Sequence, residues 1–278
     1  MIRMKHVSAL ALVAGLALTL AAPAQAVTQS WNGWKWSRIG KLQISLGDNL
    51  GAAWKPYLAP AAAGWSAPAF LDTVVATGKS TSSCGASFGT VQVCSANYGA
   101  NGWLGYANVW LSGTYIVQGT VRLNDYYFSQ ARYNTDAWRM ATICQEIGHT
   151  LGLDHTNTVK TDANTGSCMD YTNDPSGLLG TNGPLANTGA NAVDYEALGL
   201  IYATLDKTQL SSTKPTMIAG AGYGINGEHL EFLTMVPEPG SWMMMLAGFG
   251  LAGAAIRRQR MSETLSAAIR RQRTAAIA

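Results

Sequence analysis

One eleven-residue segment, from Gln145 to His155, constrains the fold more than any other feature of the chain. Positions i and i+4 of an α-helix lie on one face, so Gln145 and His149 can point toward a common centre, with Glu146 beside them. Gly152 follows near the end of this helix, and glycine tolerates the positive φ of a sharp turn. Such a turn can return His155 toward the same centre. The spacing therefore predicts a helix, a tight turn and converging polar side chains.

These residue types at this spacing are typical of a hydrolytic zinc site. A catalytic zinc ion uses three protein ligands and keeps a fourth position open. It polarises a carbonyl group and lowers the pKa of its water toward about 7. A carboxylate beside it can take a proton from that water and deliver it to the leaving amine. We therefore predict His149 and His155 as ligands of Zn²⁺ and Glu146 as general base, acting on a protein or peptide substrate.

The segment resembles the motif of the metzincin zinc peptidases, His-Glu-x-x-His-x-x-Gly-x-x-His followed by a Met-turn. His149 matches the second histidine, Gly152 the glycine and His155 the third histidine. The sequence Ser-Cys-Met-Asp-Tyr at 167–171 resembles the Met-turn. The resemblance implies a zinc-dependent endopeptidase in which Gly152 supports the turn.

The Met-turn brings two further residues into the expected site. In metzincins the methionine packs beneath the metal without binding it, which implies a supporting role for Met169. In astacin-like and serralysin-like members a tyrosine two positions later binds the metal or stabilises the transition state. Tyr171 occupies that position, so the resemblance implies a catalytic role for it. The alternative interpretation is that Tyr171 only packs.

Gln145 stands where the family has its first histidine ligand. A carboxamide oxygen is a poorer zinc donor than an imidazole nitrogen. Three outcomes are open: Gln145 is the third ligand, another group such as water, Tyr171 or His229 completes the set, or no metal binds. The Cys144-Gln145-Glu146 opening is similar to that of a group of exported bacterial metzincin-like proteins. If no metal binds, the chain is instead a non-catalytic metzincin-fold protein that binds a cell surface or an extracellular matrix, and this is the second hypothesis.

Hydrophobic periodicity and turn residues predict the secondary structure. Asn134, Thr135 and Asp136 supply helix-capping side chains, Ser112-Gly113 indicates a hairpin turn, and Pro56 and Pro60 can kink or divide a helix. The region from Thr208 to Leu233 is either a last hairpin or a spacer. The predicted elements are strand Lys41–Leu46, helix Asn49–Trp65, strand Phe70–Ala76, strands Leu104–Leu111 and Thr114–Leu123, helix Ala137–Leu151 and helix Ala190–Ala203.

This order predicts an α+β fold with a mixed twisted sheet. The resemblance, which covers roughly residues 41–204, adds an active-site helix, a Met-turn and a C-terminal helix. The last predicted helix resembles the closing helix of matrixin-like domains, and its core face should carry Val193, Ala197, Leu200 and Ile201. The segment Gly119–Phe128 resembles the edge strand and following loop that lie alongside substrate in that family.

All four cysteines lie in the central part of the chain, and an even count in an exported protein favours disulfides. Cys84 and Cys94 bracket a Gly/Ser-rich segment that one bond would close into a loop. Cys144 directly precedes the zinc motif and Cys168 directly precedes Met169. If the Met-turn lies beneath the motif helix, these two can meet and brace the site. Free thiols are the alternative.

The N-terminus reads as an export signal. Arg3, Lys5 and His6 precede a 15-residue apolar run at 8–22, and Ala24-Gln25-Ala26 is a small-x-small cleavage site. We therefore expect residues 1–26 to be a signal peptide that directs export across the inner membrane. An uncleaved N-terminal anchor is the alternative.

The C-terminus carries a second targeting sequence. Pro237-Glu238-Pro239 precedes an apolar stretch at 242–256 and an arginine cluster at 257–260. This order resembles the PEP-CTERM sorting signal, which implies exosortase-type sorting machinery as a partner and delivery to the cell surface or an extracellular polysaccharide matrix. The apolar stretch is shorter than the ~20 residues of a full bilayer crossing. We expect a transient C-terminal membrane anchor, with an ordinary anchor as the alternative.

Charge and domain organisation follow from removing the two ends. Residues 27–235 hold 11 Lys and Arg against 14 Asp and Glu, so this part is near −3 and no basic patch for nucleic acid is expected. We expect a metallopeptidase domain at 27–205, a spacer or hairpin at 206–235, the sorting signal at 236–260 and a tail of no assigned role at 261–278. The tail repeats the sequence Ala-Ala-Ile-Arg-Arg-Gln-Arg of 254–260 at 267–273.

Three tryptophans lie close together near the expected mature start. Trp31, Trp34 and Trp36 are either packing residues or a surface that binds carbohydrate. Large aromatic side chains dominate the energetics of cores, and we therefore favour packing.

Overall fold

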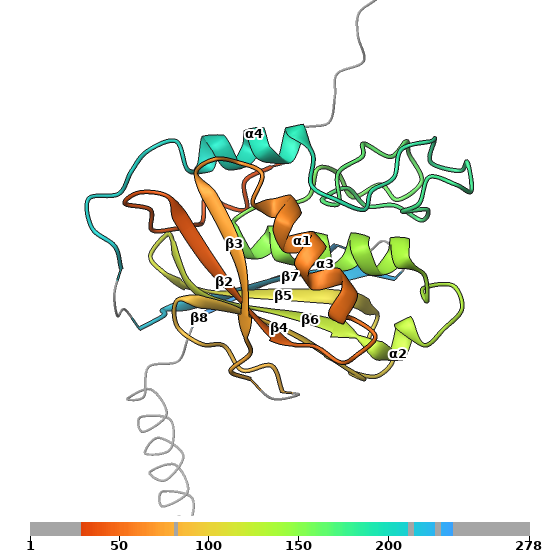
Figure 1. Cartoon of the computed structure of the whole chain (residues 1–278), viewed down its shortest axis with the longest axis horizontal. Helices are drawn as coiled ribbons and strands as arrows, with labels where there is room; N and C mark the ends of the chain where they lie inside the picture. The colour runs from red at the N-terminus through yellow and green to blue at the C-terminus, as the bar shows by residue number, and fades with distance from the viewer. Residues whose placement is uncertain (1–28, 81–82, 211–213, 226–228, 236–278) are drawn as a thin grey trace, which may run out of the picture.

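A mixed sheet organises the chain in its computed structural model, which describes residues 29–80, 83–210, 214–225 and 229–235 (Figure 1). The strand order is β3-β2-β4-β6-β5-β7-β8, and β1 pairs with β6. The pairs among β2, β3, β4 and β6 are parallel, whereas β5, β7 and β8 join the sheet antiparallel. The strands are β1 (Lys35–Trp36), β2 (Leu42–Asn49), β3 (Leu71–Thr77), β4 (Thr90–Ala96), β5 (Trp103–Ser112), β6 (Tyr115–Asn124), β7 (Met217–Gly224) and β8 (His229–Met235).

Two helices pack side by side against this sheet, α1 (Lys55–Trp65) and α3 (Asp136–Thr150) (Figure 1). A short helix, α2 (Asp125–Phe128), precedes α3, and α4 (Ala192–Ile201) follows the polar loop after the motif. The predicted α+β class with a mixed sheet is confirmed.

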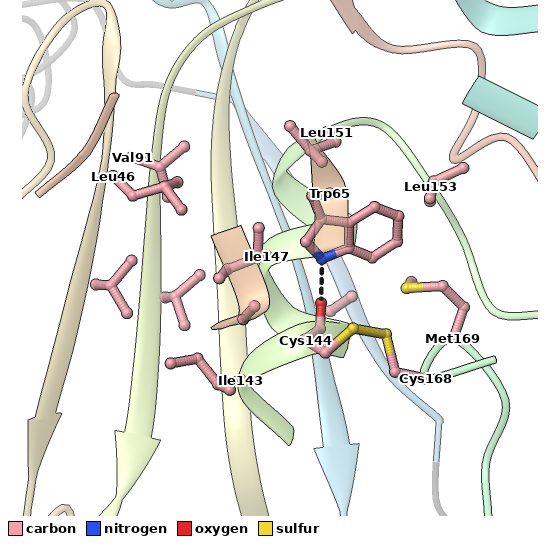
Figure 2. Close-up of a cluster of buried hydrophobic side chains, with 14 of the residues drawn as sticks. Leu46, Trp65, Val91, Ile143, Cys144, Ile147, Leu151, Leu153, Cys168 and Met169 are labelled. Carbon is pink, nitrogen blue, oxygen red and sulfur yellow. Dashed lines mark hydrogen bonds between the residues drawn. A yellow bond between two sulfur atoms is a disulfide. The ribbon is translucent and has the colours of Figure 1, made fainter. Parts of the chain in front are cut away.

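The core lies between the sheet and α3. Figure 2 shows Ile143 and Ile147 on the side of α3 that faces Leu46 and Val91 of the sheet. All four side chains are at most 2% exposed, and burying such a side chain stabilises the fold by roughly 1.5–3 kcal/mol. The opposite side of α3 meets Trp65, whose indole N–H donates to the Cys144 carbonyl at 3.0 Å. Helix α3 is therefore enclosed on both sides.

Most predicted elements are confirmed, with differences in the first helix, in the sheet and in the last helix. The first helix begins at Lys55 rather than Asn49, because β2 continues to Asn49 and pairs there with Cys94. Strand β4 was not predicted, although it lies in the middle of the parallel part of the sheet. The helix runs through Pro60 without dividing, and Pro56 lies in its first turn, where no N–H is needed.

The prediction of Gly119–Phe128 as an edge strand and loop is wrong. Strand β6 lies inside the sheet between β4 and β5, and the chain then forms α2. The sheet continues beyond β5 because the segment after α4 forms a hairpin, β7–β8, that adds to it. The sequence allows either a hairpin or a spacer over Thr208–Leu233, and the structure shows the hairpin β7–β8.

The predicted core face of the last helix is also only partly right. Leu200 is 73% exposed, whereas Asp194 and Leu198 are buried. Asp194 faces inward because its carboxylate accepts hydrogen bonds from the Ser167 hydroxyl at 2.7 Å and from the Asn191 backbone at 2.8 Å. Asn191 and Asp194 form a capping box, and its hydrogen bonds, rather than the hydrophobic periodicity, place Asp194 on the buried face of α4.

The expected signal peptide, sorting signal and tail lie outside the described residues. Within the described ranges, no helix is long and apolar enough to cross a membrane.

Candidate metal centre

Helix α3 carries its polar motif inside the protein. The Thr135 side chain caps the helix by accepting from the Trp138 backbone, as expected from the sequence. Gln145, Glu146 and His149 are each 0% exposed. Buried polar groups are costly unless they are hydrogen-bonded or coordinate an ion, so each of these three requires a partner.

The predicted sharp turn after α3 is present. Gly152 has φ +96°, and a Cβ there would collide with the backbone carbonyl of Trp34. The N-terminal segment runs along this turn, and the Trp31 N–H donates to the Gly152 carbonyl at 2.8 Å. The predicted packing role of Trp31, Trp34 and Trp36 is confirmed, because all three are at most 7% exposed.

The turn brings His155 against His149. Their Nε2 atoms lie 3.1 Å apart, and their ring centroids lie 4.5 Å apart. Two nitrogens that each bind one tetrahedral zinc at 2.0–2.1 Å would lie about 3.3 Å apart. The spacing of the two imidazoles therefore fits a shared zinc ion.

The opposite nitrogen of each imidazole faces an oxygen. His149 Nδ1 lies 2.9 Å from the Leu153 carbonyl, and His155 Nδ1 lies 3.2 Å from the Asp154 carboxylate. Both oxygens favour a proton on Nδ1, which leaves the lone pair of a neutral imidazole on Nε2. With both protons on Nδ1 the two lone pairs face each other as they would around a shared metal ion, whereas a proton on one Nε2 makes the contact a hydrogen bond between the rings.

Asp154 was part of the motif but received no role from the sequence. Burial alone would raise the pKa of its carboxyl group, but hydrogen bonds from the His155 side chain and backbone outweigh burial and lower it. A carboxylate behind a ligating histidine orients the ring and increases its basicity. The position of Asp154 directly before the third histidine is the sequence signal that could have identified this role.

Gln145 is oriented by the Met-turn. Its side-chain N–H donates to the Cys168 carbonyl at 3.0 Å, and its Oε1 is buried with no hydrogen-bond partner in the described structure. An unsatisfied buried acceptor costs about 1–3 kcal/mol. Among the residues that the structure describes, no three His, Cys, Asp or Glu side chains are grouped to hold a metal. The amide oxygen of Gln145 is therefore a buried acceptor left open on the same helix as His149.

The Met-turn lies directly against α3. Gly148 leaves space for the Met169 sulfur and the Trp65 ring, which a Cβ would overlap. The predicted Cys144–Cys168 disulfide is confirmed, with Cα atoms 6.0 Å apart, and Figure 2 shows it beside Met169. These contacts fix the helix relative to the turn.

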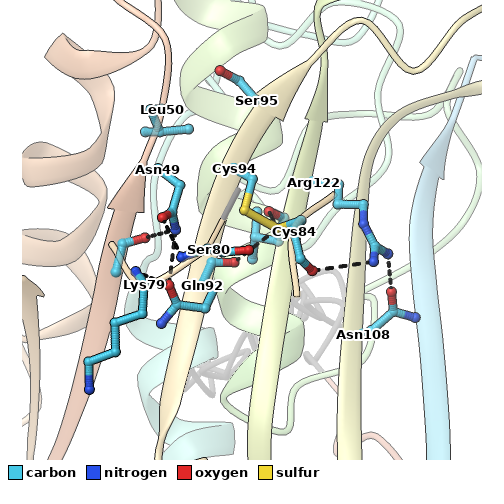
Figure 3. Close-up of a disulfide and its surroundings, with 12 residues drawn as sticks. Asn49, Leu50, Lys79, Ser80, Cys84, Gln92, Cys94, Ser95, Asn108 and Arg122 are labelled. Atoms are coloured by element: carbon cyan, nitrogen blue, oxygen red, sulfur yellow. Dashed lines mark hydrogen bonds between the residues drawn. A yellow bond between two sulfur atoms is a disulfide. The ribbon is translucent and has the colours of Figure 1, made fainter. Parts of the chain in front are cut away.

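The second predicted disulfide, Cys84–Cys94, is also confirmed and lies on the other side of the sheet (Figure 3). The Cys84 carbonyl accepts from the Arg122 guanidinium at 3.5 Å, and that guanidinium also donates to Asn108 at 2.6 Å. This bond closes the loop before β4, and within the described residues the Cys84 sulfur contacts the carbonyls of Gln92 and Val121 rather than a residue of the predicted metal site.

Glu146 lies under the antiparallel strands β5 and β7. One carboxylate oxygen accepts from the Tyr223 backbone at 3.2 Å, whereas the other is buried without a partner among the described residues. Burial raises the pKa of Glu146 well above its ordinary value, against the lowering effect of backbone hydrogen bonds from Tyr223 and Ala107. Gly105 is required here, because a Cβ would lie 2.6 Å from the Glu146 side chain. Neither Tyr223 nor Gly105 was singled out from the sequence.

Tyr171 places its ring beside the histidines, 4.5 Å from His155 between centroids. Its hydroxyl donates to the Gly222 carbonyl of β7 at 2.8 Å. Burial raises the pKa of Tyr171, and the nearby Glu146 adds to this effect. The structure thus brings His149, His155 and Tyr171 into contact, while the contact recorded for the Gln145 side chain is with Cys168. His229, the other group considered as a ligand, lies in β8 opposite Tyr223.

Comparisons with known proteins support the targeting assignment. A family model described as "PEP-CTERM protein-sorting motif" matches residues 236–260. The chain is therefore exported and carries a C-terminal sorting signal of Gram-negative bacteria, which is recognised by exosortase. No curated protein matches the sequence.

Solved structures give one further similarity. A chain titled "Structure of Myroilysin" has 14% sequence identity, with 68% of this chain and 89% of that chain covered, at a TM-score of 0.36. A likeness at this score carries no argument about fold or chemistry.

Proposed function

We propose that the chain is an exported, surface-sorted, zinc-dependent endopeptidase with a metzincin-like active site. The observation that carries the proposal is the pair of Nε2 atoms 3.1 Å apart on His149 and His155, each ring held from behind by an oxygen. The buried carboxylate of Glu146 follows one residue after Gln145 on the same helix. A dry site with two converging imidazoles and a carboxylate is suited to hydrolysis.

We assign Gln145 as the third ligand through Oε1. The hydrogen bond from its Nε2 to Cys168 fixes which end of the amide carries the open acceptor. Zinc bound there would act as a Lewis acid on the scissile carbonyl and would acidify the attacking water. The disulfide behind Cys168 keeps the Gln145 side chain in place.

The chain's own residues then move the proton. Glu146 accepts a proton as the water oxygen attacks the carbonyl carbon, and it returns that proton to the amine nitrogen as the C–N bond breaks. The substrate gains one carboxylate and one amine end, and Glu146 ends in its initial state. Tyr171 stands beside His155 and can stabilise the developing oxyanion once its hydroxyl leaves Gly222.

A second candidate function is a non-catalytic binding protein of the cell surface or matrix. The observation that favours it is the carboxamide of Gln145 in place of an imidazole, combined with no group of three His, Cys, Asp or Glu within the described residues. In that case the buried polar cluster would hold a proton rather than a metal.

The test is chelator-sensitive cleavage of a casein-type substrate after zinc addition. We expect cleavage to be lost in Glu146→Gln and retained in the matched variant Glu196→Gln, which changes an exposed residue of α4. Absence of bound zinc together with no cleavage after zinc addition would exclude the peptidase and leave the binding protein. Activity unaffected by Glu146→Gln would also exclude the proposed mechanism.

A further inference from the structure

Strand β7 lies across the candidate metal centre. It pairs antiparallel with β5, from Met217 opposite Leu111 to Gly224 opposite Trp103. Extended peptides commonly bind proteins by adding a strand to a sheet edge. Without β7, strand β5 would be the edge of the sheet next to Glu146, where a peptide could pair. Strand β7 of the same chain occupies that position.

Three contacts of β7 engage the residues assigned to catalysis or their neighbours. The Tyr223 N–H donates to Glu146, and the Gly222 carbonyl accepts from the Tyr171 hydroxyl. The Tyr223 hydroxyl donates to the Thr172 carbonyl at 2.7 Å and accepts from the Thr172 N–H at 3.0 Å. The general base and the oxyanion-stabilising hydroxyl are therefore both bound to this strand.

The side chain of Tyr223 fills the remaining space. It is 4% exposed, and its ring lies 4.9 Å from Tyr171 and 5.9 Å from Trp138. The hollow lined by these rings has a volume of about 10 Å³, which is room for about one water molecule. A peptide cannot reach Glu146 through this hollow while β7 is in place.

The hairpin is built to leave more easily than the central strands. The middle of β7 is Ala219, Gly220, Ala221 and Gly222, which bury little apolar surface, and Phe232 and Leu233 of β8 remain 40% and 57% exposed. Peripheral elements with few buried side chains open at lower free energy than a core.

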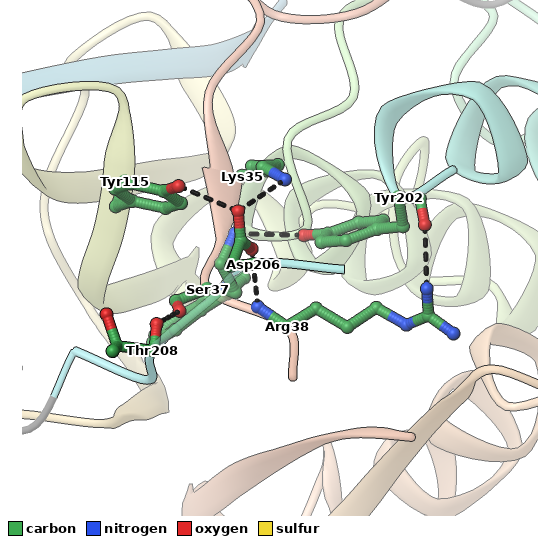
Figure 4. A network of polar contacts seen from close by, with 8 residues as sticks. Lys35, Ser37, Arg38, Tyr115, Tyr202, Asp206 and Thr208 are labelled. Carbon is green, nitrogen blue, oxygen red and sulfur yellow. Dashed lines mark hydrogen bonds and ion pairs between the residues drawn. The ribbon is translucent and has the colours of Figure 1, made fainter. Parts of the chain in front are cut away.

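The chain between α4 and β7 is anchored near its start, and directly before β7 the Thr216 N–H donates to the Leu111 carbonyl at 2.7 Å. Asp206 binds Lys35 and the Arg38 backbone, and the Ser37 hydroxyl donates to the Thr208 carbonyl (Figure 4). None of these contacts of Asp206 and Thr208 involves β7, so the hairpin can leave β5 while α4 and its anchor stay in place.

We propose that the β7–β8 hairpin is an autoinhibitory segment that closes the site and must leave β5 before a peptide enters. This inference rests on the proposed peptidase function. Strand β8 of this hairpin ends at Met235, and the matched sorting motif begins at the next residue, 236.

The test uses two hairpin variants of the full chain with matched controls. In Gly222→Ala the new Cβ would meet the Tyr106 ring and lie 3.0 Å from the Gly105 carbonyl, whereas in Gly199→Ala it would meet nothing within 4 Å. Ala221→Asp places a charge at a fully buried position, and Ala203→Asp places it at an exposed one. The readouts are amide hydrogen exchange of β7, modification of His149 and His155 by diethyl pyrocarbonate, and casein cleavage.

We expect β7 exchange, histidine modification and cleavage to rise by about tenfold or more in the hairpin variants and to stay unchanged in the controls. Faster histidine modification without cleavage would support closure of the site by the hairpin and contradict the proposed peptidase function. If the amides of β7 exchange freely but His149 and His155 stay protected from diethyl pyrocarbonate, closure by the hairpin would be contradicted. A β7 that is as protected as β6 in both variants, or wild-type cleavage as fast as that of the variants, would also contradict it.

Discussion

At position 145 a carboxamide stands where an imidazole would complete a set of three histidines. In the proposed zinc site His149 and His155 converge, Asp154 supports one ring, and the Cys168 carbonyl fixes the Gln145 amide. The identity of one side chain therefore sets the strength of the site, because an amide oxygen is a weak donor for zinc.

Replacing Gln145 by histidine should strengthen zinc binding. We expect Gln145→His to lower the dissociation constant by at least about 10–100-fold, since even losing a partner behind a ligand costs that much affinity. The measurement is competition with a chromophoric chelator at neutral pH. Gln118→His, in the half-buried part of β6, is the control and should change nothing. Equal affinities for wild type and Gln145→His would show that position 145 does not face the metal.

At the scale of elements, two links hold the Met-turn and the N-terminal segment against α3. The Cys144–Cys168 bond joins the helix to the turn, and the Tyr202 hydroxyl joins Trp36 to the end of the helix at Leu151. Neither link involves His149 or His155, so removing one of them tests the support of the site and leaves the two histidines unchanged.

Removing the Cys144–Cys168 disulfide should destabilise the fold more than removing Cys84–Cys94. The two bonds have sequence separations of 24 and 10, and the loop-entropy model assigns them about 3.5 and about 2.7 kcal/mol. The paired Cys→Ser variants compared by urea unfolding give the difference. We also expect zinc affinity to fall only in the Cys144/Cys168 variant. Unchanged zinc binding there would mean that Gln145 does not depend on this brace.

Asp206 should make the N-terminal anchor sensitive to acid. Burial alone would raise its pKa, but hydrogen bonds from the Arg38 backbone, Tyr115 and Lys35 lower it below the ordinary value. A carboxyl group with a lowered folded-state pKa stabilises the fold above its unfolded pKa of ~3.9, and this stability is lost as pH falls through the folded pKa.

Asp206→Asn should therefore reduce the unfolding free energy by about 1–3 kcal/mol at pH 7, with the difference vanishing near about pH 2. Urea unfolding across this pH range checks it. Asp72→Asn, from the exposed pair with Lys41, should cost less than about 1 kcal/mol. A difference that is constant with pH would contradict the assigned charge.

How much the sequence predicts differs between local and long-range features. The motif helix, its Thr135 cap, the Gly152 turn and the hairpin at Ser112-Gly113 all follow from signals within a few residues, and all are present. The position of β6 inside the sheet depends on its parallel pairing with β4, which no local periodicity encodes. The exposed Leu200 reflects a polar network that overrides the hydrophobic pattern.

The candidate site shows the same division. Gln145, Glu146, His149, Gly152 and His155 share one local motif, so their convergence was predictable. Tyr223 contacts Glu146 from 77 positions away, and its own sequence neighbourhood of small residues contains no sign of a site.

At the scale of the whole molecule, the catalytic residues, the covering hairpin and the sorting motif follow one another along the chain. The chain is exported, and its sorting signal directly follows the strand pair that closes the site. The hairpin proposed to close the site is therefore the structural element that joins the sorting motif to the rest of the chain.

Zinc content tests the central claim most directly. After dialysis of the purified full chain against zinc-free buffer at neutral pH, elemental analysis should find about one zinc per chain, as a single catalytic site requires. His149→Ala and His155→Ala should each reduce this to near zero while the fold is retained by circular dichroism. A folded wild-type chain without zinc, or zinc retained in both histidine variants, would contradict the assignment of His149 and His155 as ligands.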